Sequence, residues 1–119
     1  VLSTTAITNV ASTVTTNLFT VPVGKTAIIT GAILRSSVVV GSVTGGATGG
    51  IGVAAGEDDI IASTLWDGFI SSTDTFYLTT AGGNHTTAVA PNVIKLGIDV
   101  GCTGGGSQQV TVDLLGYLV

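Results

Sequence analysis

Threonine and the other β-branched residues dominate this sequence and constrain its fold more than any other feature. The 119 residues include twenty Thr, together with many Val and Ile. β-Branched side chains are restricted at χ1 in a way that favours strands over helices. Residues that favour helices, such as Glu, Lys, Arg, Gln and Met, are nearly missing. The composition therefore predicts an all-β fold without a helix of consequence.

Alternation of apolar and polar residues predicts individual strands. The segment Asn92–Val100 gives the clearest case, because every second residue up to Val100 is apolar. A period of two indicates a half-buried strand with one wet face. The C-terminal segment Val110–Leu118 alternates similarly, but its outer face becomes apolar toward the end, at Leu115 and Tyr117. Such an outer face suits an edge that meets another subunit.

One segment, Thr26–Leu34, is apolar on both faces. This pattern is typical of a strand that is covered by the opposing sheet on one side and by a neighbouring chain on the other. Further strands are expected at residues 12–19, 38–43, 51–55 and 75–80. About eight strands separated by Gly-, Asn- and Ser-rich turns predict one antiparallel β-sandwich domain, jelly-roll-like, over residues 1–119.

Ionic side chains are scarce. They make up 8% of the residues, against about 25% in ordinary soluble domains. We expect Thr, Ser and Asn to coat part of the surface and an assembly to bury much of the rest. The formal net charge is −4, and the only cations, Lys25, Arg35 and Lys95, are far apart in sequence. This distribution argues against nucleic acid and against an anionic membrane surface as partners.

Segments that direct a chain to a membrane or to secretion are not expected. No stretch approaches 18 consecutive apolar residues, as a transmembrane helix requires. Val1 is not followed by the basic region and long apolar core of a secretory signal.

Two glycine motifs resemble phosphate-binding loops but lack the context that such loops need. Gly24-Lys25-Thr26 matches the end of a P-loop, but Phe19 stands where the first Gly belongs, and a strand follows in place of a helix. The segment Gly50–Ala55 matches a loose dinucleotide-binding fingerprint, but it follows a Gly-rich turn and leads into another. We interpret both segments as turns beside strands.

No residue set predicts catalysis, a cofactor or a metal. His85 is the single histidine, whereas zinc and non-haem iron sites use two or three. No Ser lies in a G-x-S-x-G elbow, so a hydrolase is not expected. The acidic cluster Glu57–Asp59 could start a single helical turn or contribute to a Ca²⁺ site, although Ca²⁺ needs six to eight oxygens. Cys102 is the only cysteine, which excludes an internal disulfide. We predict a protein that is not an enzyme.

Trp66 is the one aromatic residue suited to be an exposed anchor. Sugar-binding modules usually display several Trp and Tyr, whereas aromatic residues total 5% here. Packing in the core or at a subunit interface is therefore favoured over ligand stacking. Together with the apolar strand faces, this gives a candidate oligomer or shell interface that comprises Ile28, Ile33, Leu34, Trp66, Leu115, Tyr117 and Val119.

The run Phe-Thr-Val-Pro-Val-Gly-Lys-Thr-Ala at residues 19–27 resembles a turn and strand common in small bacteriophage particle proteins. The downstream segments Asp58–Ala62 and Thr75–Leu78 and the ending Val-Asp-Leu-Leu-Gly-Tyr at residues 112–117 are similar too. The resemblance spans about two-thirds of the sequence. It implies a β-sandwich, frequently trimeric, that decorates a capsid or belongs to a head fibre or tail. It carries no catalytic residues.

These features predict a structural protein on the outer surface of a phage particle, most simply a capsid decoration (cement) protein that stabilises the shell. Its partners would be copies of itself, as a homotrimer, and the major capsid protein or another virion protein. Low charge and apolar strand faces suit many equivalent buried contacts. The alternatives are a receptor- or glycan-binding subunit of a tail or head fibre, with Trp66 and the Gly-rich turns as ligand loops, and a self-assembling surface or filament subunit of cellular origin.

Overall fold

The computed structural model describes residues 1–80 and 86–119, which contain nine strands and no helix. The prediction of an all-β fold is therefore confirmed, with one strand more than the expected eight. The strands are β1 (Ser3–Ile7), β2 (Val14–Thr20), β3 (Thr26–Val40), β4 (Thr48–Gly52), β5 (Ile61–Leu65), β6 (Thr75–Thr79), β7 (Thr86–Val89), β8 (Val93–Val100) and β9 (Ser107–Leu118).

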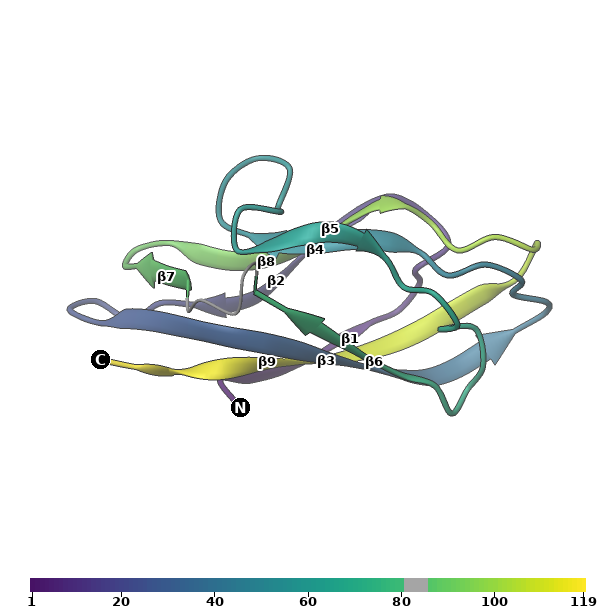
Figure 1. Ribbon diagram of the computed structural model, residues 1–119, viewed down its shortest axis with the longest axis horizontal. Helices are drawn as coiled ribbons and strands as arrows, with labels where there is room; N and C mark the ends of the chain where they lie inside the picture. The colour runs from purple at the N-terminus through teal and green to yellow at the C-terminus, as the bar shows by residue number, and fades with distance from the viewer. Residues whose placement is uncertain (81–85) are drawn as a thin grey trace.

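The strand order is that of a long hairpin rolled into a sandwich. Strands β1, β2, β3 and β4 pair antiparallel with β9, β8, β6 and β5, in reverse order along the chain. The pairing of β3 with β9 and of β4 with β8 then joins these strand pairs into two sheets. The strand orders are β1-β9-β3-β6 and β2-β8-β4-β5. Two packed sheets connected in this way form a jelly roll. Figure 1 shows β9, β3 and β6 in one layer and β5, β4 and β8 in the other.

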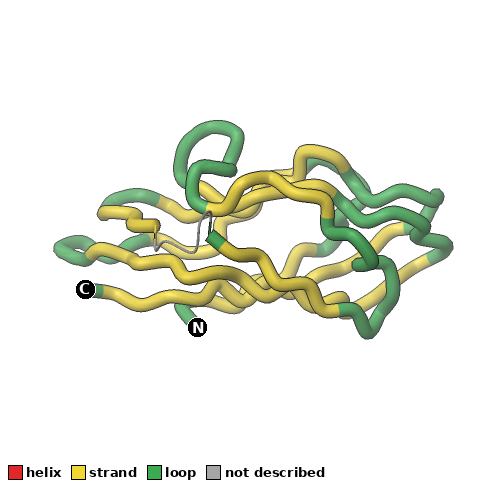
Figure 2. The backbone as a smooth tube through the Cα atoms, viewed as in Figure 1, coloured by secondary structure: helices red, strands yellow, loops and turns green. Residues whose placement is uncertain are grey.

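Strand β7 adds to the first of these sheets and makes it five-stranded. It pairs with the start of β3, whose later residues pair with β6. We call the two layers the five-stranded and the four-stranded sheet. Figure 2 shows that loops gather at the two ends of the sandwich, and that one more loop, between β4 and β5, rises from the four-stranded layer.

The core lies between the sheets and is built from alternate residues. In β9 the inward residues Val110, Val112 and Leu114 have no exposed surface. In β3 a register shift between Ile29 and Gly31 changes which positions point inward. The inward residues of β3 are therefore Ala27 and Ile29 before the shift and Ala32 and Leu34 after it, all fully buried. This shift explains why the segment looks apolar on both faces.

Strand β8 follows the predicted alternation until a second irregularity. Ile94, Leu96 and Ile98 are buried as predicted, but Val100 is 57% exposed. Gly49 of β4 pairs with Ile98 and the preceding residue pairs with Val100, so β8 has one extra residue at Asp99. An extra residue of this kind is a β-bulge, and it turns the following side chain to the other face. The prediction that Val100 points inward was therefore wrong.

Candidate interaction surface

Residues predicted for an interface come together on the outer face of the five-stranded sheet. Strands β3 and β9 pair along most of their length, so their outward side chains form neighbouring rows. Ile28 lies opposite Tyr117, and Leu115 lies opposite Gly31. Val119 follows β9 and continues the same row, with 60% of its surface exposed. Two strands that are far apart in the sequence thus build one surface.

Strand β6 contributes a residue that the sequence analysis missed. Tyr77 lies opposite Ile33 of β3 and points outward. Its ring rests over Gly31, where a Cβ atom would lie 2.7 Å from the Tyr77 hydroxyl oxygen. Within β6, Phe76 is half-buried and Leu78 is buried, and Tyr77 lies between these two apolar residues on the opposite face. We define the apolar face as Ile28, Ile33, Tyr77, Leu115 and Tyr117.

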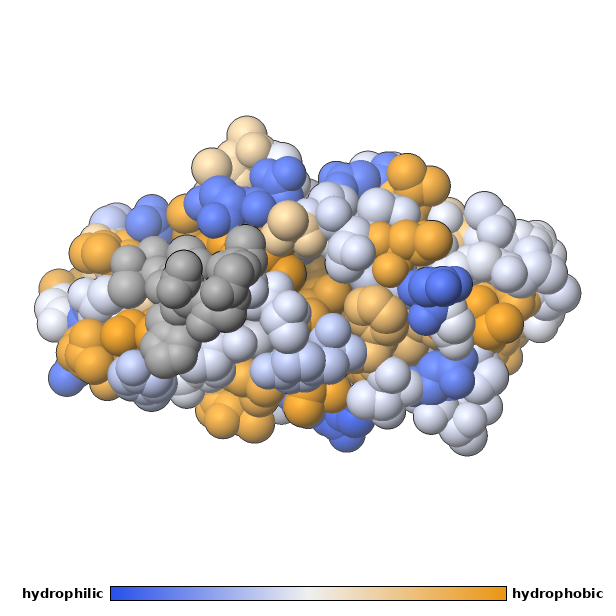
Figure 3. Space-filling view, in the orientation of Figure 1, coloured by the Kyte–Doolittle hydropathy of each residue, from blue (hydrophilic) through white to orange (hydrophobic). Residues whose placement is uncertain are grey.

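The apolar face is partly open to solvent. Tyr77 and Tyr117 are about half exposed, at 52% and 47%, and the other three members are half-buried. Figure 3 shows apolar side chains in orange along the lower edge of the view, where β3 and β9 run. Contiguous exposed apolar surface of this kind marks sites of protein–protein contact.

The charges beside the apolar face neutralise each other. Arg35 of β3 donates a hydrogen bond from Nη2 to Oδ2 of Asp113 of β9 at 2.8 Å, an ion pair as well. The hydroxyl of Thr4 donates to the second carboxylate oxygen, Oδ1, at 2.7 Å. Both oxygens of Asp113 therefore have a partner, and the pair adds no net charge to this side of the molecule.

Leu34 and Trp66 do not belong to this surface. Both side chains are fully buried in the core of the isolated chain. Leu34 points inward from β3, and the Trp66 ring meets Phe69 edge-on, with 6.1 Å between the ring centres. Neither side chain has surface to offer a partner, so including them in the interface was wrong. The idea of Trp66 as an exposed ligand anchor fails for the same reason.

The outer face of the four-stranded sheet is built differently. Its central positions are glycines, namely Gly50, Gly52 and Gly97. The loop between β4 and β5 lies against them, and a Cβ atom at Gly97 would lie 2.9 Å from Cβ and from Oε2 of Glu57. The glycines make room for the chain's own loop, which covers the middle of this face and leaves Thr15 and Asn17 of β2 exposed.

The acidic cluster has a structural place in that loop. The Asp59 carboxylate accepts hydrogen bonds from the amides of Val53 and Ala54, at 2.8 and 3.3 Å. Residues 53–59 form turns and bends, so the helical turn expected after Glu57 does not form. Within the described part of the chain, no three His, Cys, Asp or Glu side chains gather as a metal site would require.

The other motifs take ordinary structural positions. Gly24 has φ +77°, and the Lys25 amide donates to the Pro22 carbonyl at 3.1 Å, so the P-loop-like motif is a turn that enters β3. Burial raises the pKa of the Cys102 thiol, which is a free cysteine. His85 lies outside the described residues. Among the residues that are described, no helix is long and apolar enough to cross a membrane.

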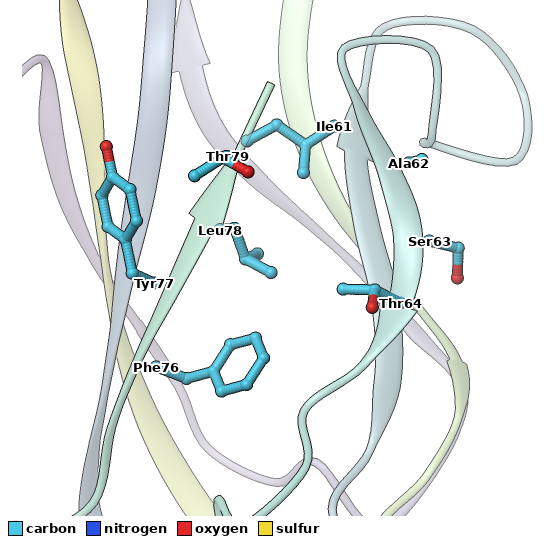
Figure 4. Close-up of a pocket in the computed structure, with 8 residues that line it drawn as sticks. All are labelled: Ile61, Ala62, Ser63, Thr64, Phe76, Tyr77, Leu78 and Thr79. Carbon is cyan, nitrogen blue, oxygen red and sulfur yellow. The ribbon is translucent and has the colours of Figure 1, made fainter. Parts of the chain in front are cut away.

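A groove of about 380 Å³ separates the edge strands β5 and β6. Its lining is Ile61, Ala62, Ser63, Thr64, Phe76, Tyr77, Leu78 and Thr79. Figure 4 shows Ile61, Phe76 and Leu78 pointing into the space, whereas Tyr77 points away from it. The groove lining contains no carboxylate, amine, imidazole or thiol.

Comparison with known proteins supports the fold. No protein-family model matches this chain, and no curated protein matches its sequence. Among solved structures, a chain of the "Cyanophage Pam1 capsid asymmetric unit" has a similar fold, with a TM-score of 0.53. The two chains are 23% identical, and the match covers 92% of this chain and 78% of the other. This likeness shows a shared fold with a chain from a phage capsid.

Proposed function

We propose that this chain is a capsid decoration protein of a bacteriophage, without enzymatic activity. It forms a homotrimer and binds to the outer surface of the shell that the major capsid protein builds. The apolar face carries this proposal, because no loop among the described residues covers it and its two tyrosines are about half exposed. Apolar surface of this kind stabilises a complex when it is buried against a partner.

Two further observations support the proposal. The fold is shared with a chain from a cyanophage capsid. The surface has few ions to maintain solubility, with three cations and seven acidic residues in the chain. A protein that works by repeated contacts on a shell needs apolar and backbone surface at each contact more than it needs a cleft.

The receptor- or glycan-binding alternative loses its main anchor. Stacking against a sugar needs an exposed aromatic face, and Trp66 has none. The exposed tyrosines Tyr77 and Tyr117 lie in the apolar face among aliphatic side chains, and the Tyr77 ring points away from the groove that β6 lines. We therefore do not propose a ligand-binding role.

Mass spectrometry of purified phage particles tests the proposed function. Decoration predicts that this chain is present in hundreds of copies per particle, in a fixed ratio to the major capsid protein. A handful of copies would place it in a tail or fibre, and absence from particles would refute the proposal. Light scattering after size exclusion tests the trimer, and a stable monomer at micromolar concentration contradicts it.

Binding to shells is tested by adding purified protein to particles that lack it. Wild-type protein is expected to bind until the sites are saturated and to raise the temperature at which the shells open. If the shells bind the protein without gaining stability, the stabilising role is wrong even though the location is right.

A further inference from the structure

The free edge of β6 is a second surface without a partner in the described chain. β6 is the last strand of the order β1-β9-β3-β6, and among the described residues it pairs only with β3. Its sequence, Thr-Phe-Tyr-Leu-Thr, contains no charged residue and no proline. Proteins commonly use charges, prolines or bulges to protect exposed edges from pairing. This edge carries none of them and is open to another strand.

One hydrogen bond between β3 and the residue before β6 shows which backbone groups of β6 point to the free edge. The Ser36 amide of β3 donates to the Asp74 carbonyl at 2.9 Å, so the backbone groups of Asp74 face β3. Backbone groups of successive residues in a strand point to opposite sides, so alternate residues of β6 also face β3. The backbone groups that point away from β3 are those of Thr75, Tyr77 and Thr79.

The largest side chain of β6 leaves this edge uncovered. Tyr77 leans back over β3, where Gly31 makes room for its ring. A Cβ atom at Gly31 would lie 2.7 Å from the Tyr77 hydroxyl oxygen and 3.0 Å from Cζ. Figure 4 likewise shows the Tyr77 ring directed away from β5 and from the groove.

We propose that β6 pairs antiparallel with β6 of a second copy of this chain, about a two-fold axis at Tyr77. The strand sequence is nearly the same in both directions, so the pairing matches like with like. Tyr77 lies opposite Tyr77 of the second copy, and Thr pairs with Thr on either side. Phe76 lies opposite Leu78 on the inner face. Aromatic–aliphatic and Thr–Thr cross-strand pairs both stabilise a sheet.

Pairing in this register also closes the groove. Phe76 and Leu78 form its floor together with Ile61. In the paired strands, Phe76 and Leu78 of the second copy form a non-hydrogen-bonded pair, in which side chains approach closely. The apolar floor of one copy therefore continues into that of the other, and water leaves both.

Charge favours a second copy as the occupant. Each chain carries a net charge of −4, so most approaches between copies bring like charges together. The groove lining and β6 contain no carboxylate, amine, guanidinium or imidazole. Two copies meet at this edge without repulsion and without desolvating an ion. A charged partner strand would find no counter-charge there.

Cysteine cross-linking of purified protein in solution tests the register. Hydrogen-bonded residues on paired strands have Cα atoms about 5.5 Å apart, within the range of a disulfide. Tyr77→Cys is therefore expected to form covalent dimers under mild oxidation. Thr75→Cys and Thr79→Cys are each expected to form no covalent dimer, because identical positions lie about 14 Å apart. A mixture of these two variants is expected to form at least about tenfold more covalent dimer than either alone.

Wild-type protein is the control, since its only cysteine, Cys102, is buried. The Thr75→Cys and Thr79→Cys mixture repeats the test with the tyrosine intact, in case Tyr77→Cys disturbs the fold. No enrichment in the mixture, or equal cross-linking by each threonine variant alone, overturns the proposal. Thr64→Cys, in the same groove but on β5, reports any other partner orientation, and cross-linking there instead of at β6 also overturns it.

This inference does not depend on where the protein works. If cross-linking fails but the protein still coats phage shells, the pairing of β6 is wrong and the proposed function stands. If β6 cross-links but particles lack the protein, the reverse holds.

Discussion

The outer faces of the two sheets differ in what covers them, although both sheets consist of antiparallel strands. On the four-stranded sheet, glycines admit the loop between β4 and β5, and Glu57 lies directly over Gly97. On the five-stranded sheet, no described loop lies over the apolar face, and the neighbouring charges of Arg35 and Asp113 neutralise each other. Within the described residues, the loop between β4 and β5 covers part of one face, whereas the apolar face stays open to the proposed partner. The glycines of β4 and β8 thus determine which outer face the loop between β4 and β5 can cover.

The largest effect is expected when the apolar face loses two side chains. The double variant Leu115→Thr and Tyr117→Thr keeps strand-forming residues but removes apolar contact area. Interface residues of this kind cost about 2 kcal/mol each when truncated, so the association constant should fall roughly a thousandfold. Light scattering at micromolar concentration should then show loss of the trimer, with no species larger than the pair of copies that β6 can form. The matched control is Asn17→Thr with Lys95→Thr, a cross-strand pair on the opposite face.

An unchanged oligomer in the apolar-face variant, with dissociation in the control, would reverse the assignment of the two faces. Thermal unfolding of each variant separates loss of association from loss of folding.

A smaller effect, on the free energy of unfolding, is expected when a larger side chain is placed under the loop on the four-stranded sheet. Gly97→Val places a side chain where Glu57 lies, so the loop must move. Overpacking of this kind costs about 1–3 kcal/mol. Urea unfolding should show this loss, while the oligomeric state stays the same. Thr15 is exposed and lies opposite Gly97 on β2, so Thr15→Val should change stability little. Equal losses in both variants would mean that the loop does not need the glycine.

A third effect concerns the charges at the apolar face. Arg35→Gln leaves the Asp113 carboxylate without its cation, and the free energy of unfolding should fall by less than about 1 kcal/mol, since the pair is exposed. Association should weaken more clearly, because each copy then brings an uncompensated negative charge to the contact. Added salt should restore association, because it screens this repulsion. Lys95→Gln makes the same change in net charge on the four-stranded sheet, away from the apolar face, and should not weaken association. A salt-independent defect would contradict the electrostatic explanation.

The smallest effect is a pH dependence in the turn before β6. The Asp74 carboxylate accepts hydrogen bonds from the amides of Ser71 and Ile70, which lower its pKa below the ordinary value for aspartate. A lowered pKa stabilises the fold above the ordinary value, and this contribution disappears as the pH falls through the lowered one. Asp74→Asn should therefore lower the melting temperature slightly at pH 7 and make no difference in strong acid. A gap of the same size at both pH values would mean that ionisation is not involved.

The sequence predicted those features that depend on composition and on alternation within a strand. The all-β class, the inward residues of β8 up to Ile98 and the alternation of β9 from Val110 to Leu114 are confirmed. These features are visible because a strand with one buried face repeats every two residues. At Val100 the alternation fails, since a bulge depends on pairing with β4.

The length of β3 was also beyond the sequence pattern. Two strands were expected, at residues 26–34 and 38–43, but one strand covers Thr26–Val40. Three polar residues, Arg35, Ser36 and Ser37, stand between the two expected strands. In the structure, Ser36 is buried and accepts a hydrogen bond from Gln108 Nε2 at 2.9 Å, and Arg35 pairs with Asp113. Both partners lie on β9, about seventy residues away in sequence, so only the fold reveals why the strand continues.

The apolar face contains only part of the residue set that the sequence predicts for an interface, because the direction of each side chain depends on strand pairing. Ile28, Ile33, Leu115, Tyr117 and Val119 were chosen from strands apolar on both sides, and the pairing of β3 with β9 brings them together. Leu34 and Trp66 have the same apolar character, but their direction depends on the register shift in β3 and on the turn after β5. Tyr77 was missed because its place on this face depends on pairing with Ile33.

The position of β9 has a consequence for the order in which the molecule is made. β9 is the last strand in chain order, yet it lies between β1 and β3, near the middle of its sheet. During synthesis β1 therefore waits for a neighbour until almost the whole domain has left the ribosome. The proposed interface, which is built from β3 and β9, therefore forms only after β9 has been synthesised.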